Sequence, residues 1–329
     1  MKKLTLALFT LLAAALLISC GKTNTDAYGC YADIDDAAAY ANKKNQDIMI
    51  IVTLDGDDEQ STDFLEKVVR APSFKEEIAS KYAVVSMDFS KKAYEATVAA
   101  EDADAAAKKA AENKANLMQK NTRIATVLNV SDTPVIYILS KEQYLITGLF
   151  YDDENRSVEG FKATLDEKAS LISDMHKMIY QTKIGNAEEK IAAIDALYEA
   201  TSPSFRILLL DLVDSVKKLD PSNKSGLVGK YMYEAAAAKS DKALLDGNVR
   251  GAVDAFVNIA DEAVIPAESR QQALYTAAYM SSMAELDELD VVLGYLEKSI
   301  SLAPESEDVP AIQRVIEALK AQAQNEASE

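Results

Sequence analysis

Strand-like patterns stop near residue 155 of this chain, and only helical periods follow. Before that point, apolar runs such as Asp47–Thr53 and Val135–Leu139 alternate with amphipathic stretches such as Ile34–Lys44. Such alternation is typical of an α/β domain built around a sheet, whereas a long helical run needs a core of its own. The 329 residues are enough for two cores. We therefore expect an α/β domain over residues 31–155 and an all-α domain over residues 156–329.

The α/β part carries further strand and helix signals. Strands are expected at Ala83–Phe89 and Tyr144–Phe150. One helix should begin after the polar loop 54–61 and end near Pro72, and a second should span Ser73–Lys81.

Residues 91–122 form an alanine-rich stretch that is dotted with charges and free of glycine and proline. Helix propensity alone predicts a helix here. Because an alanine face buries little area, we expect this helix to be a solvent-exposed insertion, with a partner contact as the less favoured alternative.

Glycines and prolines divide the second half into helical segments with short turns, which is typical of an α-solenoid. Residues 273–306 resemble one tetratricopeptide (TPR) unit, although the spacing between repeat ends is irregular. We therefore expect TPR-like helical pairs, with helices at Val158–Thr182, Ala187–Ala200, Phe205–Leu219, Leu227–Leu245, Val249–Ala263, Ala267–Ala284, Leu286–Leu302 and Val309–Ala323.

The first 20 residues have the order of a secretory signal: a basic start, an apolar run at Leu4–Ile18, and a small residue before Cys20. The apolar run is shorter than the roughly 20 residues that a spanning helix needs. Leu17–Gly21 resembles a lipobox, the motif in which cysteine becomes the lipid-bearing N-terminus. We therefore expect residues 1–19 to be a lipoprotein signal peptide and residues 20–30 to be a linker whose Cys20 carries acyl chains such as palmitate.

The formal net charge of −18 limits the classes of partner. An acidic surface disfavours nucleic acid and anionic lipid head groups. We therefore expect a protein or peptide of the cell envelope as the partner, with the membrane reached only through the lipid. The soluble part would face the periplasm or the exterior.

Two stretches, Ile50–Phe89 and Val127–Phe150, resemble the thioredoxin-like family. In that family a buried strand leads to Trp-Cys-x-x-Cys, which opens a helix with a Leu-Glu pair and two valines. Placing Leu65–Val69 on that helix puts Glu59 and Thr62 at the two cysteine positions. The resemblance therefore implies a thioredoxin-like domain that lacks both redox thiols.

Asp132-Thr133-Pro134 matches the second signature of the family, a small residue before a cis-proline that starts the next strand. The resemblance implies that the backbone at Thr133 and Pro134 pairs with extended peptides. The alternative is that Pro134 only fixes a turn.

Thiol–disulfide exchange requires an attacking thiolate, and neither Glu59 nor Thr62 can supply one. The remaining cysteine, Cys30, is either a small buried hydrophobe or a reactive thiol. The single histidine, His176, fits a helical face better than a catalytic site, and no phosphate loop or zinc spacing occurs. We therefore expect no enzyme activity and no cofactor, with a redox helper acting through Cys30 as the rival hypothesis.

The loop after the first strand places Asp55, Asp57, Glu59 and Glu66 at calcium-ligand positions of an EF-hand. Gln60 replaces the glycine that the turn requires, so a calcium-dependent assembly module is the weaker alternative. Acids at the start of a helix are also favoured by its free N–H groups. The sequence thus favours a redox-inactive envelope lipoprotein that binds protein or peptide.

Overall fold

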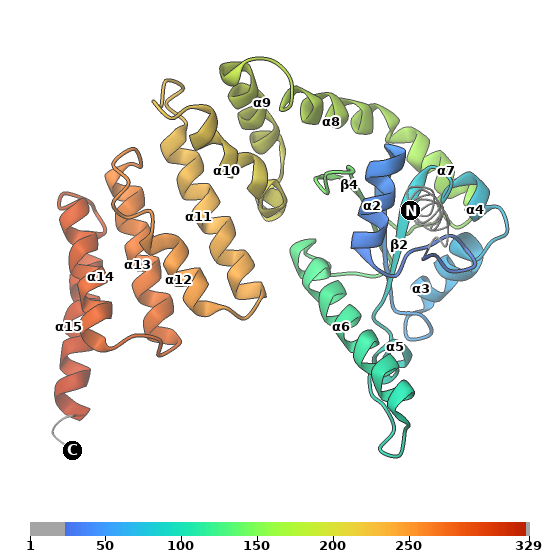
Figure 1. Ribbon diagram of the computed structural model, residues 1–329, viewed down its shortest axis with the longest axis horizontal. Coiled ribbons are helices and arrows are strands. Elements are labelled where there is room, and N and C mark those ends of the chain that lie inside the picture. The colour runs from blue at the N-terminus through green and yellow to red at the C-terminus, as the bar shows by residue number, and fades with distance from the viewer. Residues whose placement is uncertain (1–23, 327–329) are drawn as a thin grey trace, which may run out of the picture. The chain divides into compact units, whose positions relative to one another are not determined.

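The structure is a computed structural model that describes residues 24–326. It divides into two compact units (Figure 1). The sheet unit, blue to green in Figure 1, runs to Asn121 and adds Ser131–Gln143 and Thr147–Glu167. The helical unit contains the rest, mainly the chain from Lys168 onward. The signal peptide and Cys20 lie outside the described residues.

The sheet unit contains four strands in the order β2-β1-β3-β4. The central strand β1 is parallel to β2 and antiparallel to β3. Asp47 pairs with Tyr82 at one end of the parallel ladder, and Ile48 pairs with Leu139 in the antiparallel one. The strands are β1 (Asp47–Thr53), β2 (Tyr82–Asp88), β3 (Val135–Leu139) and β4 (Leu145–Phe150).

A fifth, short segment extends the sheet at β2. The Tyr31 N–H donates to the Val84 carbonyl at 2.7 Å, and the Ser86 N–H donates to the Tyr31 carbonyl at 2.9 Å. On the other side, a cis peptide bond between Thr133 and Pro134 directly precedes β3. This mixed sheet with a cis-proline before its antiparallel strand confirms the thioredoxin-like fold expected for the first domain.

Burial explains why these apolar runs form strands. Every residue of β1 after Asp47 is buried, and so is every residue of β3. Strands covered on both faces read as continuous apolar runs instead of alternating ones. Both strands have the bounds expected from the sequence.

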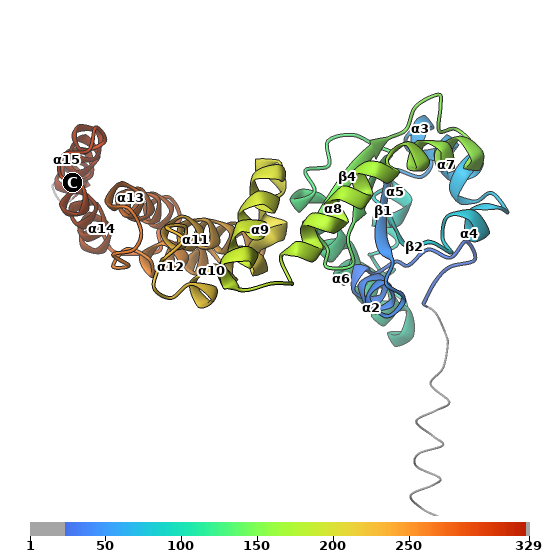
Figure 2. The same ribbon diagram turned by 90° about the horizontal axis from the view of Figure 1, so that it is seen from above.

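Helices pack on this sheet and on each other. Helix α2 (Ile34–Lys44) contacts β1 and β2, and α7 (Val158–Glu167) contacts η1 and α4 (Figures 1 and 2). The remaining helical elements of this region are α3 (Glu59–Phe64), the π-helical turn η1 (Leu65–Val69), α4 (Phe74–Glu77), α5 (Lys91–Glu95) and α6 (Ala105–Val127).

The alanine-rich stretch differs from the single helix expected over residues 91–122. It contains α5 and the longer α6, separated by residues 96–104. The cause is local: the Asp104 carboxylate accepts the Ala107 N–H at 2.7 Å and so starts a new helix. Near its other end, α6 is tied to the start of α2, where Lys120 pairs with Asp33 and Asp35. The helix that joins β2 to β3 is therefore part of the fold, although most of its surface is exposed.

The sheet unit also extends further than residue 155. Phe161 and Leu165 of α7 are buried, and the Phe161 ring meets the Phe64 ring at 5.6 Å between centroids. The helix expected at Val158–Thr182 therefore breaks at Lys168 into α7 and α8, and α7 belongs with the sheet. Tertiary packing decides this division, because the helical period itself continues across the break.

The helical unit is all-α, as expected, and its consecutive helices pack on one another from α10 to α15. Its elements are α8 (Ala169–Gln181), α9 (Ala187–Ala200), the 3₁₀ helix η2 (Pro203–Leu209), α10 (Leu210–Leu219), α11 (Val228–Leu245), α12 (Val249–Val257), α13 (Ala267–Met283), α14 (Leu289–Leu302) and α15 (Val309–Glu326). Packing between chain neighbours is the organisation of a helical array.

The array is held by a series of local cores. Ala236, Phe256 and Ala273 join α11, α12 and α13, whereas Leu296 and Ile312 join α14 and α15. No helix of the described chain is long and apolar enough to cross a membrane.

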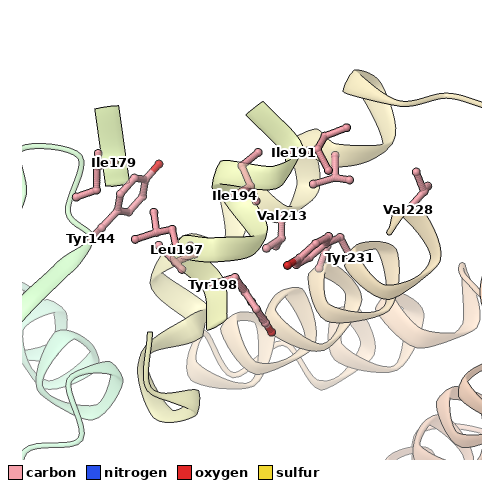
Figure 3. Packing of buried hydrophobic residues seen from close by; sticks show 12 residues of the cluster. Tyr144, Ile179, Ile191, Ile194, Leu197, Tyr198, Val213, Val228 and Tyr231 are labelled. Carbon is pink, nitrogen blue, oxygen red and sulfur yellow. The ribbon is translucent and has the colours of Figure 1, made fainter. Parts of the chain in front are cut away.

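A further core joins α9, α10 and α11, and Figure 3 shows its buried side chains. A polar network lies beside this core. The Tyr198 and Tyr231 rings meet edge to face at 5.3 Å, and the Tyr231 hydroxyl donates to Asp195 at 2.5 Å. Lys230 binds both Asp195 and Glu199, at 2.9 and 2.7 Å. Each buried phenol therefore keeps its apolar ring in the core while its hydroxyl has an acceptor, since Tyr198 donates to Glu234.

Two glycines in the array provide a matched test of the packing. A Cβ on Gly229 of α11 would lie 2.2 Å from the Val264 carbonyl oxygen, whereas a Cβ on Gly294 of α14 would meet nothing within 4 Å. We predict that Gly229→Ala destabilises the helical unit by about 1–3 kcal/mol through overpacking. Gly294→Ala should instead stabilise it by about 0.5–1 kcal/mol. Urea unfolding followed by circular dichroism measures both, and equal effects would contradict this packing.

Candidate functional site

The loop between β1 and α3 is fixed by its own hydrogen bonds. The N–H groups of Asp57 and Asp58 both donate to the Leu54 carbonyl at 3.1 Å. The Thr62 hydroxyl accepts from the Gly56 N–H at 3.0 Å and donates to the Asp58 carbonyl at 2.8 Å. Thr62 therefore fastens the loop to the first turn of α3.

Asp58 is the N-cap of α3, with extended backbone angles and a carboxylate that accepts the Ser61 N–H at 2.8 Å. A thiolate at a helix N-terminus is stabilised by the same free N–H groups. By this capping geometry a thiol pair would fit at Asp58 and the fully buried Ser61. These positions lie one residue before Glu59 and Thr62, where the alignment predicts the two cysteine positions.

The physical reason for this shift is where the helix starts. Glu59 is already inside the helix and its side chain is exposed, while the Thr62 hydroxyl is used by the loop. The preference for Asp at N-cap positions was the sequence signal that could have located Asp58.

The start of α3 meets the cis-proline segment. The Thr133 side chain lies close to the half-buried Asp58 carboxylate. Partial burial opposes ionisation of Asp58, but the polar groups of Ser61, Gln60 and Thr133 around the carboxylate together lower its pKa. The two stretches that carry the family resemblance therefore lie against each other, and Asp58 stays ionised at neutral pH.

The main chain of Thr133 is unpaired at this place. None of the described residues forms a hydrogen bond with its N–H or C=O group, and the β1–β3 ladder begins only at Val135. Pro134 is buried and Thr133 is half-buried. Thr133 therefore has free backbone groups just before the start of β3.

The acidic loop does not assemble the calcium site considered above. Asp55 pairs with Arg70, and the Asp57 carboxylate accepts the Lys91 N–H at 2.5 Å. Glu59 and Glu66 are exposed. Within residues 24–326, no three acidic, histidine or cysteine side chains gather as metal ligands would. These acids serve the loop and its neighbours, since a hard cation needs converging oxygens.

Cys30 is 3% exposed. Burial, with a smaller contribution from the charge of Asp26, raises the pKa of its thiol to about 12. A thiol in this state is protonated at neutral pH and is a poor nucleophile. Its surroundings are those of a small buried hydrophobe. His176, the other residue singled out by type, is exposed on α8.

Comparisons with known proteins match parts of the chain. A family model described as "Uncharacterised protein C-terminal domain" matches residues 227–325, in the helical unit. An uncharacterized protein of Treponema pallidum (strain Nichols) is 28% identical over 133 residues. That match covers 40% of this chain and 44% of the relative, so it spans less than half of either protein.

One solved structure, titled "DsbH Oxidoreductase", is similar to part of the chain. It has 11% sequence identity and a TM-score of 0.32, and the match covers 46% of this chain and 92% of that one. The fold assignment rests on the strand order and the cis-proline described above. By these features the sheet unit has a thioredoxin-like fold without thiols at the start of α3, and a helical array follows it.

Engineered cysteine pairs test which residues occupy the redox positions. In a protein that begins after Cys20 and carries Cys30→Ala, we predict that Asp58→Cys with Ser61→Cys closes readily to a disulfide. The Asp58 side chain already points at the Ser61 main chain. The matched pair Glu59→Cys with Thr62→Cys should close several-fold more slowly, because these side chains point to solvent and back into the loop. Counting free thiols after incubation with oxidised glutathione distinguishes them, and equal closure would restore the original alignment.

Proposed function

We propose that this protein is a membrane-anchored envelope lipoprotein whose thioredoxin-like domain binds extended polypeptide without exchanging disulfides. Its helical array would supply a second surface for a protein partner. The observation that carries the proposal is the unpaired main chain of Thr133 beside a helix start that lacks thiols. An extended peptide can form hydrogen bonds with backbone N–H and C=O groups that have no partner in the sheet.

Two observations support a non-redox role. The start of α3, where a thiol pair would act, has Asp58 and Ser61 side chains, and neither carries a thiol. Cys30, the thiol that a redox helper would use, is buried and has a strongly raised pKa. The rival hypothesis of a redox helper therefore has no accessible nucleophile in the described chain.

The helical array supports the assembly part of the proposal. Stacked helices give an extended surface, and arrays of this kind commonly use it for partner binding. The last helix, α15, buries Ile312 and Ile316 against the array and exposes polar side chains such as Gln313 and Glu317.

Peptide binding at Thr133 is tested by amide hydrogen exchange. The probe is a short synthetic peptide of alternating valine and threonine with a central alanine. We predict that the Thr133 amide exchanges more slowly when the peptide is added, because an extended peptide beside Thr133, before the β1–β3 ladder begins, would accept its N–H. The amide of Lys43, on the exposed side of α2, is the control and should not change. Unchanged exchange at Thr133 with every peptide tried would contradict the proposed function.

Lipidation is the second prediction of the proposal, and it rests on the lipobox at residues 17–21. Mass spectrometry of the mature protein should find Cys20 as a diacylated N-terminal residue. Cys20→Ser should release the protein from the membrane fraction, because two or more acyl chains are needed for stable anchoring. The matched variant Cys30→Ser should leave fractionation unchanged. An unmodified N-terminus at another residue would refute the anchor.

A further inference from the structure

The Asp58 carboxylate lies where a bound peptide would pass. It caps α3 through the Ser61 N–H and lies close to the Thr133 side chain, so it stands next to the unpaired main chain of Thr133. A strand that paired with Thr133 would bring every second side chain to the same face. One of these side chains would therefore face Asp58.

The Asp58 carboxylate accepts the Ser61 N–H and has no cationic partner within the described chain. The nearby cations are already used. Lys67 pairs with Asp63 at 2.5 Å, and Arg70 pairs with Asp55. Asp132, just before Thr133, is exposed and adds to the negative charge. The site therefore combines free backbone groups with one half-buried and uncompensated carboxylate.

We infer that Asp58 is a specificity residue of this site and selects extended peptides that carry a lysine or arginine where the strand passes the start of α3. The inference rests on the proposed peptide binding at Thr133. The position that would hold an attacking thiol in a redox protein here holds a fixed anion. Backbone pairing gives affinity without regard to sequence, whereas the carboxylate discriminates by charge.

A conservative variant separates the charge of Asp58 from its structural role. Asn caps helices as well as Asp does, so Asp58→Asn keeps the bond from the Ser61 N–H and removes only the charge. Glu59→Gln removes a charge from the neighbouring exposed residue and is the matched control. Both variants should fold like the wild type, which circular dichroism checks.

The experiment uses the peptide series of alternating valine and threonine, with Lys, Arg, Gln or Glu at the centre. Binding is measured by isothermal titration and by exchange of the Thr133 amide. We expect the Lys and Arg peptides to bind roughly fivefold more tightly than the Gln peptide, as for a partly exposed ion pair. Asp58→Asn should abolish this preference, and Glu59→Gln should keep it.

The outcomes distinguish the two proposals. If peptides protect the Thr133 amide but bind equally well whatever their charge, peptide binding stands and the role of Asp58 is refuted. The role of Asp58 is also refuted if the preference for Lys survives in Asp58→Asn, or if Glu59→Gln weakens this preference to the same degree. In either case the acidic surface as a whole, and not Asp58, attracts the basic peptide. If no peptide of the series protects Thr133, the proposed function itself fails.

Discussion

The pairing of β1 between β2 and β3 determines the geometry of the sheet unit. Apart from Asp47, every residue of β1 is buried, so the strand has one position in which its apolar side chains avoid water. The same pairing fixes Thr53 opposite Asp88, and the loop that follows Thr53 runs directly into α3. Val135 is held against Val52 from the other side. Asp58 lies shortly after β1 and Thr133 lies shortly before β3. Because the ladder holds these two strands in register, it brings the two residues together.

Electrostatics at the site shows how an acidic loop can be stable without a metal. Each of Asp55, Asp57 and Asp63 has a local donor, either a cation or a backbone N–H. Asp58 is half-buried, as Asp55 and Asp63 are, but unlike them it has no cationic partner. Hydrogen bonds to a carboxylate favour its ionised form, so the loop holds one half-buried anion that no cation of the described chain neutralises. This is the physical basis for treating Asp58 as a recognition residue.

The helical unit is stabilised in a different way. Its cores are small and each joins helices that are neighbours in sequence, so most of its contacts form over short loops. Close approach then depends on small residues, such as Gly229 beside the Val264 carbonyl and the buried alanines of α11 and α13. Polar groups in these interfaces are hydrogen-bonded to neighbouring helices, as the Tyr231 hydroxyl is to Asp195.

The amino-acid sequence determined the elements and the fold class. Helices α2 and α9 and strands β1 and β3 have the bounds that periodicity and caps predict, since these signals act over a few residues. The absence of a Cys-x-x-Cys pair was equally visible. Only the tertiary structure decided that α7 packs with the sheet and that Asp55 and Asp57 have protein partners. The reason is that these features depend on contacts between segments far apart in the chain, which local periodicity does not encode.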